Sequence, residues 1–165
     1  ERVKECKEGL DIINKKYKKY KYLVEIEEKV LYEFKKTLNK KIFNRVLFVI
    51  QENQRTHDSA NKISQSKLKE FGKLMYESHH GLKELYDVSC KELDFLVDFT
   101  YSYNEIIGSR MMGGGFGGCT INLIEENFVD DFVKTVSNAY LKKFNIRLNA
   151  FQINIDSGLT VNNEF

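Results

Sequence analysis

The sequence predicts an α+β domain in which helices cover one face of an antiparallel sheet of about four strands. Apolar residues recur at every third or fourth position through most of the chain before the glycine-rich stretch. That stretch separates two β-rich runs, and two further short β-rich runs follow near the end of the chain. The length of 165 residues fits a single domain, and we assign residues 1–165 to it.

Helices are predicted first from this spacing, because the chain has no proline to mark their ends. Ser64 and Ser66 are candidate caps for the fourth helix, and Gly81 is expected to end or bend it. The expected helices before the glycine-rich stretch span residues 3–14, 23–38, 41–63, about 68–80 and 90–103.

The character then changes to strands. Two strands flank the glycine-rich stretch, and a sixth helix separates them from a closing pair joined by the turn Asp156-Ser157-Gly158. The expected strands span residues 108–112, 119–125, 150–155 and 159–161, and the expected sixth helix spans 128–144.

Composition excludes several classes of protein. The 26 basic and 24 acidic residues nearly cancel, no apolar run is long enough for a membrane span, and no signal-peptide pattern is present. Cys6, Cys90 and Cys119 form neither a disulfide framework nor a metal-ligand pattern, which favours a reducing compartment. We therefore expect a cytoplasmic location and no membrane partner.

A lysine- and tyrosine-rich stretch, residues 15–22, has two interpretations. Lysines between aromatic rings can bind single-stranded nucleic acid through phosphate contacts and base stacking. A solvated linker or helix end is the favoured interpretation, because Glu25, Glu27 and Glu28 interrupt the positive charge directly afterwards. No nucleic-acid partner is expected.

The segment Gly113-Gly114-Gly115-Phe116-Gly117-Gly118, called the glycine loop below, holds five of the ten glycines of the chain. Glycine permits positive φ and lacks Cβ, so consecutive amides can point at one concave site and bind an anion such as phosphate. A tight connection between strands, packed against a neighbouring domain, explains the composition equally well. The spacing matches neither the GxxxxGK[ST] phosphate loop nor the dinucleotide fingerprint.

The residues around the glycine loop resemble a known family. Residues 108–120, GSRMMGGGFGGCT, resemble the third signature of galactokinases within the GHMP kinase superfamily, with Met112 in place of the usual threonine. Further resemblance extends along the chain through the segments Arg2–Cys6, Glu52–Arg55, Glu70–Leu82 and Tyr86–Asp94, in the last of which Lys91 replaces the usual proline.

The resemblance implies the carboxy-terminal half of a galactokinase, which transfers the γ-phosphoryl group of ATP to the anomeric hydroxyl of galactose with the help of Mg²⁺. The family binds galactose and ATP through GRVNLIGEH-like and GLSSSA segments of an amino-terminal domain, and neither occurs in this sequence. The chain by itself is therefore expected to be inactive and to bind no cofactor. A different GHMP sugar kinase and a non-catalytic galactokinase-like sugar sensor are the alternatives.

By resemblance, the amides of the glycine loop, Gly113–Gly118, line the cleft beside ATP and sugar, and no catalytic or metal-binding residue is expected in this chain. Arg110 and Met112 flank the loop, and Arg110 is expected to meet either a phosphate or a carboxylate. Of the other polar candidates, His79, His80, Glu92 and Asp94 are expected to be structural, His57 to lie on a helix surface, and Cys119 to be a small buried strand residue.

Overall fold

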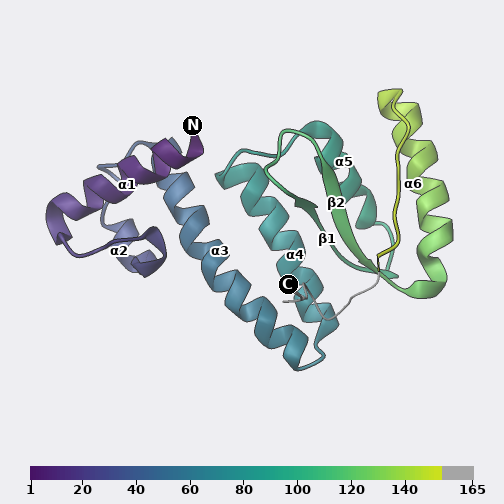
Figure 1. Cartoon of the computed structure of the whole chain (residues 1–165), viewed down its shortest axis with the longest axis horizontal. Coiled ribbons are helices and arrows are strands. Elements are labelled where there is room, and N and C mark those ends of the chain that lie inside the picture. Colours follow the sequence, from purple (N-terminus) through teal and green to yellow (C-terminus); the bar gives the residue numbers. More distant parts are fainter. Residues whose placement is uncertain (154–165) are drawn as a thin grey trace, which may run out of the picture.

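The computed structural model describes residues 1–153, which form six α-helices and a two-stranded antiparallel sheet. Figure 1 shows α3 and α4 on one side of the β-hairpin and α5 and α6 on the other. The elements are α1 (Arg2–Tyr17), α2 (Glu28–Tyr32), α3 (Lys40–Ser64), α4 (Leu68–His80), α5 (Lys91–Thr100), β1 (Ile106–Met112), β2 (Cys119–Ile124) and α6 (Val129–Phe144).

The helical hairpin α3–α4 follows from local signals that the sequence carries. The Asn39 side chain accepts a hydrogen bond from the Ile42 amide at 2.9 Å, which caps the start of α3. Ser64 and Ser66 were expected to cap α4, and this expectation is wrong. Ser66 has a φ of 56° and forms the turn, while the Ser64 hydroxyl donates back to the Asn61 carbonyl of α3.

The expected helix over residues 23–38 is also wrong. The chain forms a 3-10 turn, Leu23–Glu25, and then the short α2. The Glu25 carboxylate accepts hydrogen bonds from the amides of Lys21 and Tyr22, at 2.7 and 3.1 Å, and Ile26 is extended. Of the apolar residues with helical spacing, Val30, Leu31 and Phe34 are nevertheless buried, because short helical turns can bury the same side chains as one helix, whereas Val24 is exposed.

The predicted bend at Gly81 is confirmed. At this residue α4 widens into a π-helical turn, Gly81–Leu85, in which the Tyr86 amide donates to the Gly81 carbonyl at 2.9 Å. The turn is followed by residues 86–90, which lie beside the glycine loop. The Phe116 amide of the loop donates a hydrogen bond to the Val88 carbonyl.

Helix α4 lies so close to β1 that the two backbones touch. A Cβ built on Gly72 of α4 would be 1.9 Å from the Ile107 carbonyl oxygen, and one built on Gly108 would be 2.5 Å from the Gly72 Cα. Only glycine permits this approach. The helix thereby covers β1 where β2 does not, which protects an edge that would otherwise expose unpaired backbone groups.

Two of the four expected strands are confirmed as β1 and β2, with Met112 opposite Cys119 at the loop end of the hairpin. The strand expected over residues 150–155 is not formed in its described part, residues 150–153, which have no ladder partner. The Phe151 and Ile153 side chains are exposed there. The strand expected over residues 159–161 lies outside the described residues.

Candidate functional site

The glycine loop connects β1 to β2 with a backbone that most residues rarely adopt. Four of its glycines have positive φ, and Phe116 has a φ of 60°. A Cβ added at Gly113, Gly114 or Gly117 would meet no atom within 4 Å, so the space beside these three residues is empty of protein. Most of the loop is thus exposed, and the anion binding that the sequence suggests for it stays a prediction.

One point of the glycine loop is firmly seated. The Phe116 amide donates to the Val88 carbonyl oxygen at 2.7 Å, and a Cβ added to Gly115 would lie 2.1 Å from that oxygen. The Phe116 amide is therefore engaged within the protein.

Residues 85–88, called the seat below, carry the Val88 carbonyl and are held by a buried arginine. Arg45, only 3% exposed, donates to the carbonyl of Leu85 and, at 3.0 Å, to the Asp87 carboxylate. Its Nε donates to the Glu5 carboxylate at 3.1 Å. A hydrogen bond from Lys41 is the main cause that lowers the pKa of Glu5 to about 2, with the Arg45 hydrogen bond adding to it against the opposing effect of burial. Helices α1 and α3 and the seat of the loop are thus joined through one ionised cluster.

Arg110, two residues before Met112 on β1, meets a carboxylate. Its Nη1 is 3.6 Å from the Glu52 Oε1, and its Nε donates to the Met111 carbonyl at 3.0 Å. The sequence left two partners open for Arg110, a carboxylate and a phosphate. The structure shows the carboxylate, and a phosphate contact stays a prediction. Met112 is half-exposed at the base of the loop.

Glu52 on α3 joins three of the segments that carried the resemblance, and sequence reasoning assigned it no role. Its carboxylate accepts hydrogen bonds from Ser78 of α4 and from Arg55, and it faces Arg110 of β1. Its place in the segment Glu52–Arg55 was the available signal. The carboxylate ties the two helices to the strand that leads into the glycine loop.

Comparison with known proteins identifies this arrangement. Residues 60–141 match the family model described as "GHMP kinases C terminal". The galactokinase of Clostridium tetani is 43% identical over 143 residues, which cover 86% of this chain and 36% of that protein. The galactokinase of Clostridium acetobutylicum is 36% identical over 96% of this chain and 41% of that protein.

The chain belongs to the GHMP kinase family. Within it, the residues correspond to the carboxy-terminal domain of galactokinases, as the sequence predicted. A crystal structure of Lactococcus lactis galactokinase complexed with galactose superposes with a TM-score of 0.82 at 28% identity, covering 88% of this chain and 38% of that one. The chain thus spans about two fifths of the length of these galactokinases.

His79 has the structural role that the sequence predicted for it in this GHMP domain. Its Nδ1 accepts a hydrogen bond from the Met111 amide of β1 at 3.2 Å, and its Nε2 is 3.4 Å from the Asp94 carboxylate. Asp94 lies in the first turn of α5 and also accepts from the Ser89 hydroxyl and faces Lys83. The histidine thereby satisfies a backbone donor on the β1 edge close to the glycine loop.

This contact predicts a pH dependence of stability. Burial is the main cause that lowers the pKa of His79 below its ordinary 6.5, against opposing effects of Asp94 and Asp98, while Lys83 also lowers it. The unfolded chain then binds a proton more readily than the folded one. The free energy of unfolding should be constant above about pH 7 and fall as the pH drops below about 6.5.

The variant His79→Gln tests this dependence, because a glutamine amide oxygen can accept from the Met111 amide but does not titrate. Urea unfolding between pH 5 and 8 should show a flatter profile for the variant than for the unchanged protein. Coincident profiles would contradict the assignment, since His57 and His80 are present in both proteins.

Other candidates lie away from the glycine loop or differ from expectation. Cys119 begins β2 but is exposed, so its expected burial is wrong, because the first residue of the strand adjoins the open loop. The first three residues of the lysine- and tyrosine-rich stretch end α1, and residues 18–22 form the connection that follows it. Lys16 and the Tyr17 hydroxyl contact Glu33 at 2.5 and 2.7 Å. This arrangement agrees with the favoured interpretation of a solvated linker or helix end.

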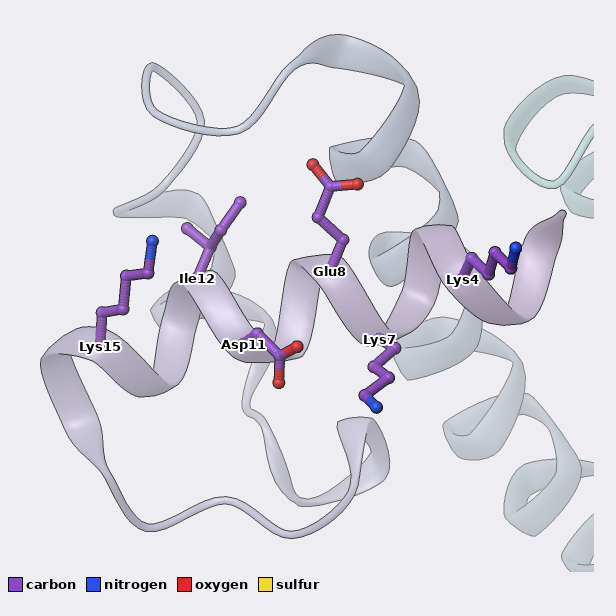
Figure 2. Close-up of a pocket in the computed structure, with 6 residues that line it drawn as sticks. All are labelled: Lys4, Lys7, Glu8, Asp11, Ile12 and Lys15. Atoms are coloured by element: carbon purple, nitrogen blue, oxygen red, sulfur yellow. The ribbon is translucent and has the colours of Figure 1, made fainter.

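A shallow surface hollow lies on α1 and shows no site-like arrangement. Figure 2 shows lysine and carboxylate side chains that project from one helix in different directions, without converging on a common point. Its lining residues are Lys4, Lys7, Glu8, Asp11, Ile12 and Lys15. Within residues 1–153, no helix is long and apolar enough to cross a membrane.

Proposed function

We propose that residues 1–165 are the carboxy-terminal domain of a galactokinase, which transfers the γ-phosphoryl group of ATP to the anomeric hydroxyl of galactose in the cytoplasm. The observation that carries the proposal is the glycine loop. The loop is held by a hydrogen bond to Val88, which lies in one of the segments that resemble galactokinases. The 43% identity to the Clostridium tetani galactokinase supports the choice of this sugar kinase over another member of the family.

In the proposed reaction, this chain would help to position the phosphates of ATP and to stabilise the negative charge on their oxygens. Phosphoryl transfer depends mainly on holding the phosphates in line and on stabilising charge on their oxygens. The peptide groups of Gly113, Gly114 and Gly117, where an added Cβ would meet no atom within 4 Å, are the ones we expect to donate to phosphate or sugar oxygens. Phe116 would hold the loop in place through its bond to Val88.

The described residues offer little for Mg²⁺. No group of three or more histidine, cysteine, aspartate or glutamate side chains within residues 1–153 is arranged to hold a metal ion. Hard oxygen ligands are what Mg²⁺ requires. We therefore assign no step involving the metal to these residues, and we propose that the galactose, ATP and Mg²⁺ contacts of the galactokinase type come chiefly from an amino-terminal domain.

The test joins this chain to the amino-terminal portion of the Clostridium tetani galactokinase and measures galactose-dependent formation of ADP. We expect the joined protein to turn over and the 165-residue chain alone to show no activity. Magnesium-dependent turnover by the chain alone would contradict the proposal. So would a folded, ATP-binding joined protein that does not phosphorylate galactose, and that result would favour the sensor.

A further inference from the structure

We propose that Arg2, at the start of α1, is a positioning residue for the glycine loop. Its guanidinium lies between the segment that seats the loop and the aromatic ring at the loop tip. The inference concerns how the loop keeps its shape, and it rests on the proposed function only for its kinetic consequence.

The first set of contacts joins Arg2 to the seat. Its Nε donates to the Tyr86 carbonyl at 2.7 Å, and its Nη2 donates to the Asp87 carbonyl and, at 3.0 Å, to the Asp87 carboxylate. The arginine side chain is only 15% exposed although it belongs to the first turn of a helix. A planar guanidinium with five donors is suited to bridging several acceptors at once, which a lysine ammonium does less well.

The second contact joins Arg2 to the loop tip. The guanidinium carbon is 5.9 Å from the centroid of the Phe116 ring, within the range of a cation–π interaction. Phe116 is 72% exposed, so Arg2 contacts the ring at the protein surface. The Phe116 amide also donates to the Val88 carbonyl, and Val88 directly follows Tyr86 and Asp87, the two residues that Arg2 contacts.

A second arginine also holds Asp87. The Asp87 carboxylate is shared between Arg2 and the buried Arg45, each at 3.0 Å. Asp87 has a φ of 55°, a conformation that non-glycine residues adopt only where the surroundings hold them. Two guanidinium groups supply that restraint on Asp87.

These contacts have a consequence for the loop. Phe116 also has a left-handed φ, of 60°, and the Val88 hydrogen bond alone must hold it if Arg2 is removed. The peptide groups on either side of Phe116 then lose their common orientation. In the proposed kinase, we expect the KM for ATP to rise about tenfold with a smaller change in kcat, because the loop is misplaced while the reacting groups are intact.

The test compares hydrogen exchange of the Phe116 amide in the 165-residue chain by NMR. In Arg2→Ala this amide should exchange about tenfold faster than in the unchanged chain, and Arg2→Lys should be intermediate because it keeps only the charge. Lys4→Ala is the matched control: it removes a positive charge from the same helical turn, where Lys4 is exposed and lines the surface hollow on α1, and it should leave the rate unchanged.

The amide of buried Val97 serves as the reference for global unfolding. An unchanged Phe116 rate in Arg2→Ala, with Val97 still protected, would overturn the inference. If the Val97 amide also exchanges faster in Arg2→Ala, the variant Phe116→Leu provides the test instead, because it removes the aromatic ring and keeps Arg2. The amide of residue 116 should then exchange about threefold faster or more. No acceleration would overturn the inference.

The kinetic measurement on the joined protein separates this inference from the proposed function. Faster exchange together with a raised KM for ATP supports both. Faster exchange with an unchanged KM supports the positioning by Arg2 and counts against the proposed role of the glycine loop in binding ATP.

Discussion

Replacing Gly115 with valine is expected to lower galactose phosphorylation by the joined protein at least about 100-fold, because the glycine loop cannot keep its shape. A Cβ at this position would lie 2.1 Å from the Val88 carbonyl oxygen and 2.8 Å from the Val88 Cβ. The native φ of 83° is also one that a β-branched residue very rarely adopts. The hydrogen bond from Phe116 to Val88 must break to relieve the contact.

Steady-state kinetics of the joined protein, together with circular dichroism to confirm folding, checks this expectation. The variant Gly115→Val combined with Val88→Ala should remain impaired, since the closest clash is with a backbone oxygen that the second substitution leaves in place. Gly114→Ala is the control for folding only, because a Cβ there meets no atom within 4 Å. Near-normal activity of Gly115→Val would show that the seated geometry is not needed.

Replacing Gly72 with alanine is expected to reduce the free energy of unfolding by about 3 kcal/mol, at the upper end of what overpacking costs. The added methyl would lie 1.9 Å from the Ile107 carbonyl oxygen and 2.5 Å from its carbon. Both contacts are with backbone, so no side-chain rotation relieves them. Helix α4 and strand β1 must separate, which disturbs the contact that places Met111 against His79.

Urea unfolding measures this loss, and the melting temperature should fall by roughly 6–12 °C for a chain of this size. Alanine favours a helix over glycine by about 1 kcal/mol, so propensity alone predicts the opposite sign. A more stable Gly72→Ala variant would mean that α4 does not approach β1 as closely as the structure has it. Gly114→Ala again provides the control, with a change of stability of well under 1 kcal/mol expected from its open surroundings.

Elements with strong local signals were predictable. Helix α3 was expected over residues 41–63 and spans Lys40–Ser64, because Asn39 caps it and its apolar residues have regular spacing. The hairpin around the glycine loop was expected because β-rich runs flank the glycines, and it is present as β1 and β2. Residues 23–38 were misjudged because burial of the apolar face does not require one continuous helix.

The candidate site was predictable in its location but not in its support. Five glycines among six residues pointed to the loop, and the resemblance to the galactokinase signature favoured a site over a tight connection between strands. The role of Arg2 was not visible, because its acceptors in Tyr86 and Asp87 are more than 80 residues away in sequence. The same holds for Glu52, whose partners Ser78 and Arg110 lie on other elements.

The sequence by itself determined most of the helices, the hairpin, the family to which the chain belongs, and the place of the glycine loop, because these depend on residue type and on spacing between near neighbours. Only the tertiary structure decided which peptide group of the loop is held by Val88. It also decided which arginines hold that seat. Contacts of this kind depend on how helices approach one another and the sheet, and that approach is set by packing at positions such as Gly72.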